Sequence, residues 1–592
     1  MQTQFSILKN SYVQLILIVS AVLLTYGFTL DVPFYLDDFS SIQENPIIYE
    51  WNGTLAQLWY YAPLRIIGYL SFALNYHFHH FEVSGYHVVN IIIHILAGFA
   101  VFGLILGLIR TPTLQNKLTS EAKTWLPIVV ALIFVLHPLQ IQAVTYIVQR
   151  LASLAALFYL ASLACYLQAR LATSWKNMSV WALASIMLAL LAFLTKQNTA
   201  TLPLAVLLIE VIFFPGRLLR WGVIAGVIFI ALGSIWFTAA YVFNYDPFSL
   251  QAMLTLTQET KSISRDSYLA TQFSVIWHYV RLFFIPTSLH IDYAYPITES
   301  FLEKSALIGL AGHIALLGIA IYVIKSFPLV TFGILFYYLA HAVESSVIPI
   351  RDVIFEHRTY LPNVGLITLC AWLLITYLPR WLDQTTMRVV IVVLLIGMSV
   401  ATWQRNEVWR DPIALWSDNV EKSPEKKRGW IILGKHLIQA GQTQAGLEAL
   451  ERSAEVTRSV DGTESKTYTV ETILNMVVAY KKLQQYDVAL YWIDHSLQNV
   501  ELRPFDRAKF YVNQGNVFFE LRRYADAENS YRQAIQFYPQ SLSARANLAS
   551  ILAATGRETE AEQMYLEILA INPDHAIVKQ NLERLRAGTH IN

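Results

Sequence analysis

The chain has 592 residues, of which 55% are hydrophobic and only 14% are charged, whereas a soluble globular protein is closer to about a quarter charged. Residues 1–410 hold 41 of the charged residues (10% of that stretch), and residues 411–592 hold the other 44 (24%). This contrast excludes a single soluble globule and a disordered or fibrous chain. It predicts a membrane domain over 1–410 and a water-soluble domain over 411–592. The net charge of +1 gives no argument for a nucleic-acid partner.

The membrane domain contains about eleven apolar stretches long enough to be candidate spans, since a helix needs roughly 20 apolar residues to cross a bilayer. They lie near 12–30, 87–109, 125–143, 150–168, 179–195, 199–214, 221–243, 306–324, 328–347, 360–378 and 387–403. The stretches predict an all-α, polytopic helical bundle. The first one lacks a cleavage-site pattern, so we expect it to be retained.

The distribution of basic residues predicts how these spans are oriented in the membrane. With the N-terminus in the cytoplasm, every alternate loop carries Lys or Arg, and these loops hold only Glu121 and Asp383 as acids. Cytoplasmic loops are enriched in Lys and Arg, so the opposite loops, including 31–86 and 244–305, are predicted to lie outside. An odd number of spans then places residues 411–592 on the same outer face.

The soluble domain repeats itself. Gly515, Ala527, Tyr531 and Pro539 recur as Ala549, Ala561, Tyr565 and Pro573, each 34 residues later. This period and pattern are typical of the tetratricopeptide repeat (TPR), a helical pair that stacks into a solenoid. We predict about four repeats that bind an acceptor or partner protein, because such arrays form concave binding surfaces. A rigid cap or an oligomerisation element is the alternative.

An adjacent acid pair, Asp37 and Asp38, follows the first span in the segment LDDFSSIQENP. Two carboxylates at a membrane surface can provide a general base and a group that binds or orients the acceptor, although an isolated pair is more often a solvated turn. Arg65 borders an apolar stretch, 64–76, that is predicted to be an interfacial helix. Its alternative is a snorkelling anchor.

Further ionisable and polar residues occur at span ends, where they are costly and therefore become candidates for function. His94 shares a helical face with other polar residues, which also fits a hydrogen-bonded seam. An outer-face lysine such as Lys196 runs against the positive-inside bias, which favours an anionic partner. The other candidates are His137, Gln149 and Arg150 in LHPLQIQAVTYIVQR, and Glu356, His357 and Arg358 in FEHRTYLP.

Carboxylates and permanent cations on one face of a bilayer suit one kind of chemistry. Arg65, Arg150, Lys196, His357 and Arg358 would bind a lipid-linked phosphate and stabilise it as a leaving group. A carboxylate would remove the proton from an attacking hydroxyl. Together these groups predict a membrane enzyme that transfers a sugar from a polyprenyl-phosphate donor.

At these residues the chain resembles a known family, the C-type (GT-C) membrane glycosyltransferases that carry C-terminal TPRs. The family includes the transmembrane-and-TPR O-mannosyltransferases and bacterial relatives. The matching stretches, in family order, are LDDFSSIQENP, the Arg65 stretch, GYHVVNIIIH, LHPLQIQAVTYIVQR, LTKQN, TQFSVIWHYVRLFFIP with LHIDYAYPI, and FEHRTYLPNVGL. They cover most of residues 31–366. The resemblance implies an eleven-span core and an inverting, single-displacement transfer.

The resemblance also implies roles for single residues. Asp37 would be the leading general base, and Asp38 would orient or bind the acceptor. Lys196 falls on a position that contacts phosphate. The remaining correspondences are Arg65 on an Arg-Pro-Leu position with Ile66 in place of Pro, Arg150 after a His-Pro motif in which Gln142 replaces a common Glu, and His290 and Asp292 in a loop motif with Ala294 in place of an acid.

The expected substrates are a polyprenyl-phosphate sugar and a protein hydroxyl, beside a lipid bilayer. No cofactor is certain, and a divalent cation beside the acid pair stays open. Two alternatives remain: a transferase or polymerase-ligase acting on surface glycans or lipids, and a non-enzymatic membrane TPR scaffold. The motif wording favours a bacterial inner membrane with the TPR domain in the periplasm, and the alternative is the endoplasmic reticulum with a lumenal TPR domain.

Overall fold

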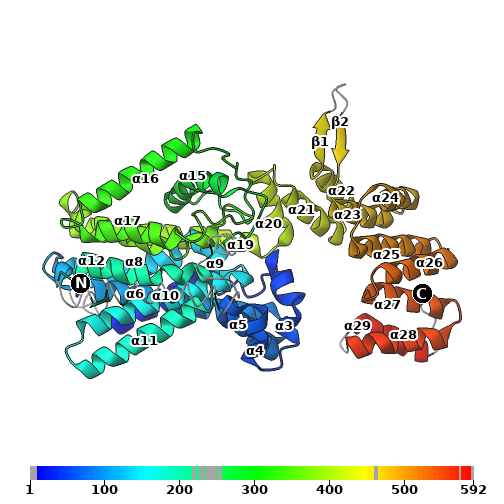
Figure 1. Cartoon of the computed structure of the whole chain (residues 1–592), viewed down its shortest axis with the longest axis horizontal. Helices are drawn as coiled ribbons and strands as arrows, with labels where there is room; N and C mark the ends of the chain where they lie inside the picture. The colour runs from blue at the N-terminus through cyan, green and yellow to red at the C-terminus, as the bar shows by residue number, and fades with distance from the viewer. Residues whose placement is uncertain are drawn as a thin grey trace. The chain divides into compact units, whose positions relative to one another are not determined.

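The computed structural model describes residues 10–215, 257–458, 464–572 and 575–587, together with a few isolated positions between 222 and 249. The chain divides into two compact units, residues 1–415 and 416–592 (Figure 1). This division lies close to the boundary that charge density predicts at residue 410. Both units are built almost entirely of helices, which confirms the all-α fold class.

Apolar helices of the first unit coincide with the predicted spans. Among the described residues, six helices are long enough to cross a membrane: α6 (Val83–Leu108), α10 (Arg150–Leu171, counted from Ile147), α11 (Trp175–Phe193), α16 (Lys304–Tyr322), α18 (Asn363–Thr376, counted to Arg380) and α19 (Gln384–Trp409). A seventh is bent by 58° between α8 (Ser120–Leu136) and the segment Pro138–Val144. Three shorter apolar helices are α2 (Ser11–Tyr26), α12 (Leu202–Phe213) and α17 (Pro328–His341).

The remaining predicted span, 221–243, lies outside the described residues, so the total of eleven stays a prediction. The helices at the periphery of the first unit have the surface that lipid requires. Only 11% of the most apolar stretch of α11 and 22% of that of α16 is buried, and these two helices lie at opposite edges of the unit (Figure 1). Large exposed apolar surfaces mark a membrane or partner contact. The chain is therefore a multi-pass membrane protein.

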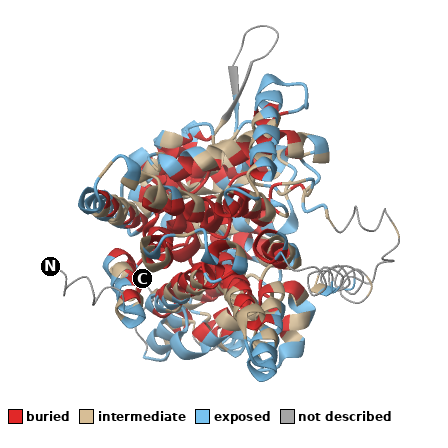
Figure 2. Ribbon diagram, turned by 90° about the vertical axis from the view of Figure 1, so that its left-hand side faces the viewer, coloured by how far each residue is buried: buried red, intermediate tan, exposed pale blue. Residues whose placement is uncertain are grey.

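The segments between the apolar helices contain the other helices of the first unit. The predicted interfacial helix at 64–76 is observed as α5 (Ile66–His79), and the stretch 265–284, which we expected only as loop, forms the helix α15 (Arg265–Phe284). Shorter turns of helix are η1 (Phe39–Gln43), α3 (Pro46–Tyr49), α4 (Leu55–Tyr61), η2 (Pro63–Arg65), α7 (Pro112–Gln115), η3 (Pro138–Gln140), α9 (Ile141–Val144), η4 (Ile147–Gln149), η5 (Gln197–Thr201), η7 (Glu356–Thr359) and η8 (Leu378–Arg380). Buried residues gather in the middle of the bundle (Figure 2).

The second unit consists of stacked helical pairs. After α20 (Pro412–Lys422) come α21 (Lys427–Gln439) with α22 (Thr443–Arg452), α23 (Val470–Lys482) with α24 (Tyr486–Asn499), α25 (Pro504–Glu520) with α26 (Tyr524–Phe537), α27 (Leu542–Ala554) with α28 (Glu558–Ile571), and the single helix α29 (Ala576–Arg586). The four pairs agree with the predicted number of repeats. Position 515 requires a glycine, because the ring of Tyr531 packs against it and lies only 2.5 Å from where a Cβ would be.

A short hairpin interrupts the helices between the first and second pairs. Strands β1 (Glu455–Arg458) and β2 (Glu464–Thr467) are antiparallel, with Glu455 opposite Thr467. The sequence analysis did not predict these strands. They are too short to change the fold class.

Helices α17 and α18 approach each other through a pair of glycines. A Cβ on Gly333 would lie 2.7 Å from the carbonyl oxygen of Gly365 and 2.8 Å from the Cβ of Leu369. Small residues allow close packing of helices inside a membrane. This contact fixes α17, whose C-terminal end leads directly to the candidate site.

We expect Gly333→Leu to destabilise the protein by about 1–3 kcal/mol, the usual cost of overpacking a well-packed interior. Thermal unfolding of the detergent-purified chain measures the effect as a lower Tm. Gly397→Leu is the matched control, because nothing lies within 4 Å of a Cβ at that position. Equal Tm values for the two variants would contradict the proposed close contact.

Candidate active site

The two predicted acids are neighbours in the sequence but differ in burial. Asp38 is fully buried, and its carboxylate accepts hydrogen bonds from the backbone N–H of Tyr35 (2.9 Å) and of Val148 (2.7 Å). Asp37 is exposed, and its own backbone N–H donates to the hydroxyl of Tyr146 (2.8 Å). Of the two acids only Asp37 is exposed, whereas Asp38 ties the first outer loop to the segment around Val148.

The backbone at the acid pair is strained. Leu36 has a φ of +39°, in the left-handed region that residues with a side chain rarely occupy, and the π-helix η1 begins at Phe39. Backbone strain and π-turns are concentrated at functional sites, where surrounding contacts hold them in place. Here the two hydrogen bonds to Asp38 supply that restraint.

The environment of Asp38 changes its acidity. Burial is the largest cause and raises the pKa of Asp38 well above its ordinary value, and the two backbone donors oppose this only in part. The carboxylate of Asp37 raises the pKa of Asp38 further, while Arg150 lowers it. Asp38 is fully buried and both its oxygens accept backbone hydrogen bonds within the fold, so the predicted acceptor-binding role does not fit it in this geometry.

Contacts with the end of α19 hold the first outer loop and the segment 138–150 in place. The hydroxyl of Tyr35 donates to the carbonyl of Trp409 at the end of α19 (2.7 Å), and the two rings pack edge to face. Thr145 donates to the side chain of Asn406 on the same helix (2.7 Å). The acid pair thus rests on two elements, the segment 138–150 and the end of α19.

Arg150 is fully buried in a network of neutral groups. Its Nε donates to Asn90 (2.6 Å), its Nη1 to Asn75 (2.6 Å) and the carbonyl of Ser71 (3.2 Å), and its Nη2 to the carbonyl of Tyr86 (2.9 Å). These bonds occupy most of its five donors. The structure therefore gives Arg150 a role in joining α5, α6 and α10, and the predicted phosphate contact is not available to it.

Lys196 has an anionic partner within the chain. Its Nζ lies 2.7 Å from Oε1 of Glu344, and both side chains are nearly buried. Asn198 donates to the other carboxylate oxygen at 3.4 Å. Burial would raise the pKa of Glu344, but Lys196 and Arg358 outweigh it and hold the pKa below its ordinary value. A donor phosphate at Lys196 would have to compete with Glu344.

Arg65 borders a surface hollow of about 250 Å³ that is formed by residues 61–65, Tyr69 and Gln197. Its Nε donates to the side-chain oxygen of Gln197 (3.3 Å). The backbone N–H of Ile67 donates to the carbonyl of Leu194 (3.1 Å), which fastens the Arg65 turn to the Lys196 loop. The structure thus brings Arg65 and the Lys196 loop to one place.

Gln142 organises the FEHRTYLP segment. Its side-chain oxygen accepts from both the backbone N–H and the ring Nδ1 of His357 (2.9 Å each), and its Nε2 donates to the carbonyl of Ile291 (3.3 Å). Burial, followed by Lys196 and Arg358, lowers the pKa of His357 well below its ordinary value. His357 is therefore neutral at neutral pH and does not supply the predicted cation.

Glu356 joins the same segment to the loop after α15. Its Oε1 accepts from the backbone N–H of His290 (2.8 Å) and from the hydroxyl of Tyr293 (2.7 Å). Asp292 is buried in the same loop. The motif residues Glu356, His290 and Asp292 come together here, and they hold two loops in register.

Arg358 keeps its charge although it is buried. Burial would lower its pKa, but the neighbouring Tyr268 and Tyr279, together with Glu344, raise the pKa above the ordinary value. Its guanidinium donates to the carbonyls of Val353 (3.2 Å) and Asp352 (2.7 Å). Lys196 and Arg358 are thus two cations whose charges both act on Glu344.

Several buried polar atoms near this cluster have no hydrogen-bond partner among the described residues. They are Oδ1 of Asn198, Oε1 of Gln272, both ring nitrogens of His341, and Oγ of Ser345. Asn198 contacts Glu344, and Gln272 shares the Val353 carbonyl with Arg358. Buried polar groups are normally paired, so this region has hydrogen-bonding capacity left for water or a polar ligand.

The remaining candidates are internal. His94 contacts the Tyr360 hydroxyl (2.7 Å) and the Val135 carbonyl (3.1 Å). His137 contacts the Phe283 carbonyl (2.9 Å), and Gln149 is half-buried beside Arg150. Across the described ranges, no group of three or more His, Cys, Asp or Glu side chains could hold a metal. Each Asp38 oxygen accepts one hydrogen bond from a backbone N–H.

Glu344 was not among the site residues predicted from the sequence. A carboxylate just after an apolar helix is costly unless it is paired, so this acid and the outer-face lysine Lys196 were a signal that the two could pair. Tyr146 and Gln197 gave no such signal. They act through hydrogen bonds that only the fold creates.

Comparisons with known proteins agree with this architecture. The family model of the tetratricopeptide repeat matches residues 512–576. The chain is 22% identical to protein O-mannosyl-transferase TMTC3 of Mus musculus over 97% of this chain and 65% of that protein. It is 23% identical to protein O-mannosyl-transferase F38B6.6 of Caenorhabditis elegans over 73% of this chain and 61% of that protein.

An uncharacterized protein of Aquifex aeolicus is 26% identical over 29% of this chain and 23% of its own length. The chain spans somewhat less than two thirds of the length of the animal relatives that it matches. The resemblance that the motifs predicted is confirmed. The chain is a multi-pass membrane protein with C-terminal TPRs, and it is similar over most of its length to named protein O-mannosyl-transferases.

Glu344→Gln removes one partner of a nearly buried ion pair, which typically costs on the order of 3 kcal/mol. Because the pKa of Glu344 is held below its ordinary value, its contribution is complete above a pH of about 4.3 and is lost as the pH falls through the lower, folded-state pKa. Thermal unfolding should therefore show a large Tm gap between wild type and variant at pH 7 that narrows in acid.

The exposed acid Glu299 supplies the control for this measurement. Glu299→Gln should leave the Tm nearly unchanged at both pH values. A gap for Glu344→Gln that does not depend on pH would show that Glu344 is not ionised through its pair with Lys196.

Proposed function

We propose that the protein is an inverting glycosyltransferase that moves a sugar from a polyprenyl-phosphate donor to a hydroxyl of an acceptor protein. The observation that carries the proposal is the acid pair: buried Asp38 holds the strained loop through two backbone hydrogen bonds, while the neighbouring Asp37 is exposed. The similarity to named protein O-mannosyl-transferases supports the reaction class.

In the proposed reaction, the acceptor hydroxyl oxygen attacks the anomeric carbon as the bond from that carbon to the phosphate oxygen breaks. The carboxylate of Asp37 takes the hydroxyl proton. Polyprenyl phosphate leaves with the bonding electron pair, and a single displacement inverts the anomeric configuration. Arg65, Lys196 and Arg358 are the cations that would stabilise the charge on the leaving phosphate.

The phosphate site is proposed around the Lys196–Glu344 pair. Lys196 and Arg358 provide positive charge there, and the unpaired polar atoms of Asn198 and Gln272 provide hydrogen-bonding capacity. The proposed site leaves out Arg150 and His357, because most donors of Arg150 are bonded within the fold and His357 is neutral. We propose positioning roles for both.

We also propose that the TPR unit holds the acceptor on the outer face of a bacterial inner membrane. The basic residues of the alternate loops support this orientation, and the similarity to the Aquifex aeolicus protein fits a bacterial setting. The animal relatives fit the endoplasmic reticulum equally well. Fusion of a reporter active only in the periplasm to the C-terminus distinguishes the two faces of a bacterial membrane.

Asp37→Asn should lower the rate of sugar transfer by about 10²–10⁴-fold, the usual contribution of a general base. The measurement uses the purified full chain in liposomes with a polyprenyl-phosphate sugar and reads the mass increase of the acceptor protein. Glu50→Gln, which changes an exposed acid in the same outer loop, should retain wild-type transfer. Full activity of the Asp37 variant would exclude this residue as the base.

A further inference from the structure

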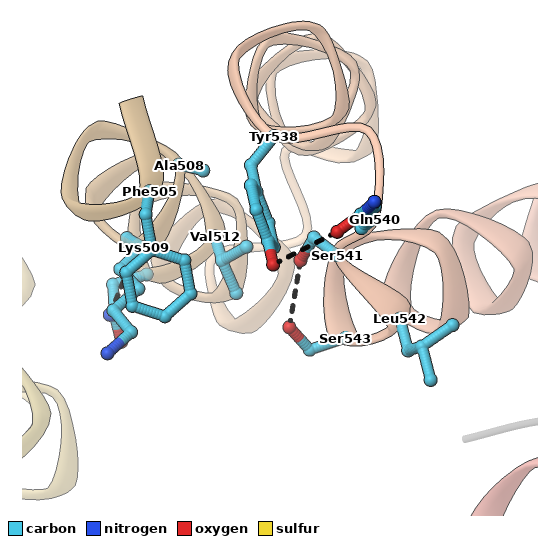
Figure 3. A pocket seen from close by; sticks show the side chains of 10 residues that line it. Phe505, Ala508, Lys509, Val512, Tyr538, Gln540, Ser541, Leu542 and Ser543 are labelled. Atoms are coloured by element: carbon cyan, nitrogen blue, oxygen red, sulfur yellow. Dashed lines mark hydrogen bonds between the residues drawn. The ribbon is translucent and has the colours of Figure 1, made fainter. Parts of the chain in front are cut away.

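The TPR unit contains a hollow of about 310 Å³ between α25 and the connection from α26 to α27 (Figure 3). Phe505, Lys509 and Val512 face it from α25, where their spacing puts them on one side of the helix. Tyr538 and the first residues of α27 close the other side. The hollow therefore lies where two consecutive repeats meet.

Two aromatic rings form an apolar wall that remains open to solvent. The rings of Phe505 and Tyr538 pack edge to face with their centroids 5.1 Å apart, and Phe505 is 42% exposed. The ammonium of Lys509 lies over the face of the Phe505 ring, 4.2 Å from the ring centroid. An exposed aromatic pair in a concave site is the kind of surface that anchors an apolar side chain of a partner.

The charge on the side chains that line the hollow is positive. Among the described residues that line it, Lys509 carries the only charge, and none is a carboxylate. The neighbouring Asp506 is buried and accepts from Arg503 (2.6 Å), so its charge is compensated. Arg545 adds a second cation at the rim, where it donates to the carbonyl of Pro539 (2.8 Å). The hollow is therefore complementary to an anionic group.

Polar groups for binding a peptide backbone lie beside the cation. Asn513 lines the hollow one turn after Lys509, and the hydroxyls of Ser541 and Ser543 lie 3.2 Å apart at the start of α27 (Figure 3). The combination is specific to this pair of repeats, because 34 residues after Lys509 the chain has Ser543 instead of a second lysine.

We propose that this hollow binds an extended segment of the acceptor protein that carries an aspartate or glutamate next to an apolar side chain. The apolar side chain packs on Phe505 and Tyr538, the carboxylate pairs with Lys509, and Asn513 hydrogen-bonds to the peptide backbone. The proposal rests on the proposed function, since it names the feature by which the TPR unit selects acceptors.

The test measures fluorescence anisotropy of two labelled peptides, Ser-Leu-Asp-Leu-Ser and Ser-Leu-Asn-Leu-Ser, with the full chain in detergent and no donor sugar. We expect the acidic peptide to bind about fivefold more tightly, the fold-change for a surface ion pair. Lys509→Glu should abolish or reverse this preference, and Phe505→Ala should weaken both peptides. Lys481→Glu, the same reversal on an earlier repeat helix, should leave binding unchanged.

The proposal is overturned if neither peptide binds the wild type, if both bind equally, or if the Lys509 and Lys481 variants bind the acidic peptide alike. Thermal unfolding of each variant shows that a loss of binding is not a loss of fold. Because the assay contains no donor, it is independent of catalysis. Normal peptide selectivity in a protein that transfers no sugar would reject the proposed function alone.

Discussion

The hydrogen bonds of the buried Asp38 carboxylate are the interaction on which the rest of the site depends. They join the backbone of Tyr35 to that of Val148 and so connect the first outer loop to the segment that follows α8. A carboxylate costs free energy when it is buried, and two N–H donors offset that cost. The strained Leu36 conformation lies between the two residues that this tie involves, Tyr35 and Asp38.

The segment 138–150, which Asp38 contacts through Val148, also connects other parts of the first unit. Gln142 holds His357 and the Ile291 carbonyl, and Arg150 holds α5 and α6 together. Most of the predicted site residues are therefore connectors. The groups on which the proposed reaction relies are instead the exposed Asp37, the hollow at Arg65, and the cluster around Lys196 and Glu344. This division explains how a site can contain many charges and still use only some of them.

Much of the fold could be predicted because it depends on local composition. Apolar runs gave the helices, and the 34-residue period gave the repeats, since both patterns are written in neighbouring residues. Helix α15 was missed because its charged residues, such as Arg265 and Arg281, break the apolar run. The β1–β2 hairpin was missed because its strands are short. In the site, the acid pair and Lys196 were proposed from their residue types, whereas the burial and internal partners of Arg150 and His357 could not be read from the sequence, because burial and partners decide whether a cation is available.

The sequence by itself determined a membrane bundle and a TPR solenoid, and its motifs resemble in their order those of a glycosyltransferase family. Composition and periodicity are sufficient for the bundle and the solenoid, because hydrophobic burial acts on every residue of a given type. Only the tertiary structure decided which acid is exposed, which carboxylate pairs with Lys196, and which repeat junction carries an aromatic and basic hollow. These features depend on contacts between residues that are distant in the chain, such as Asp38 with Val148 and Lys196 with Glu344, and no local pattern encodes them.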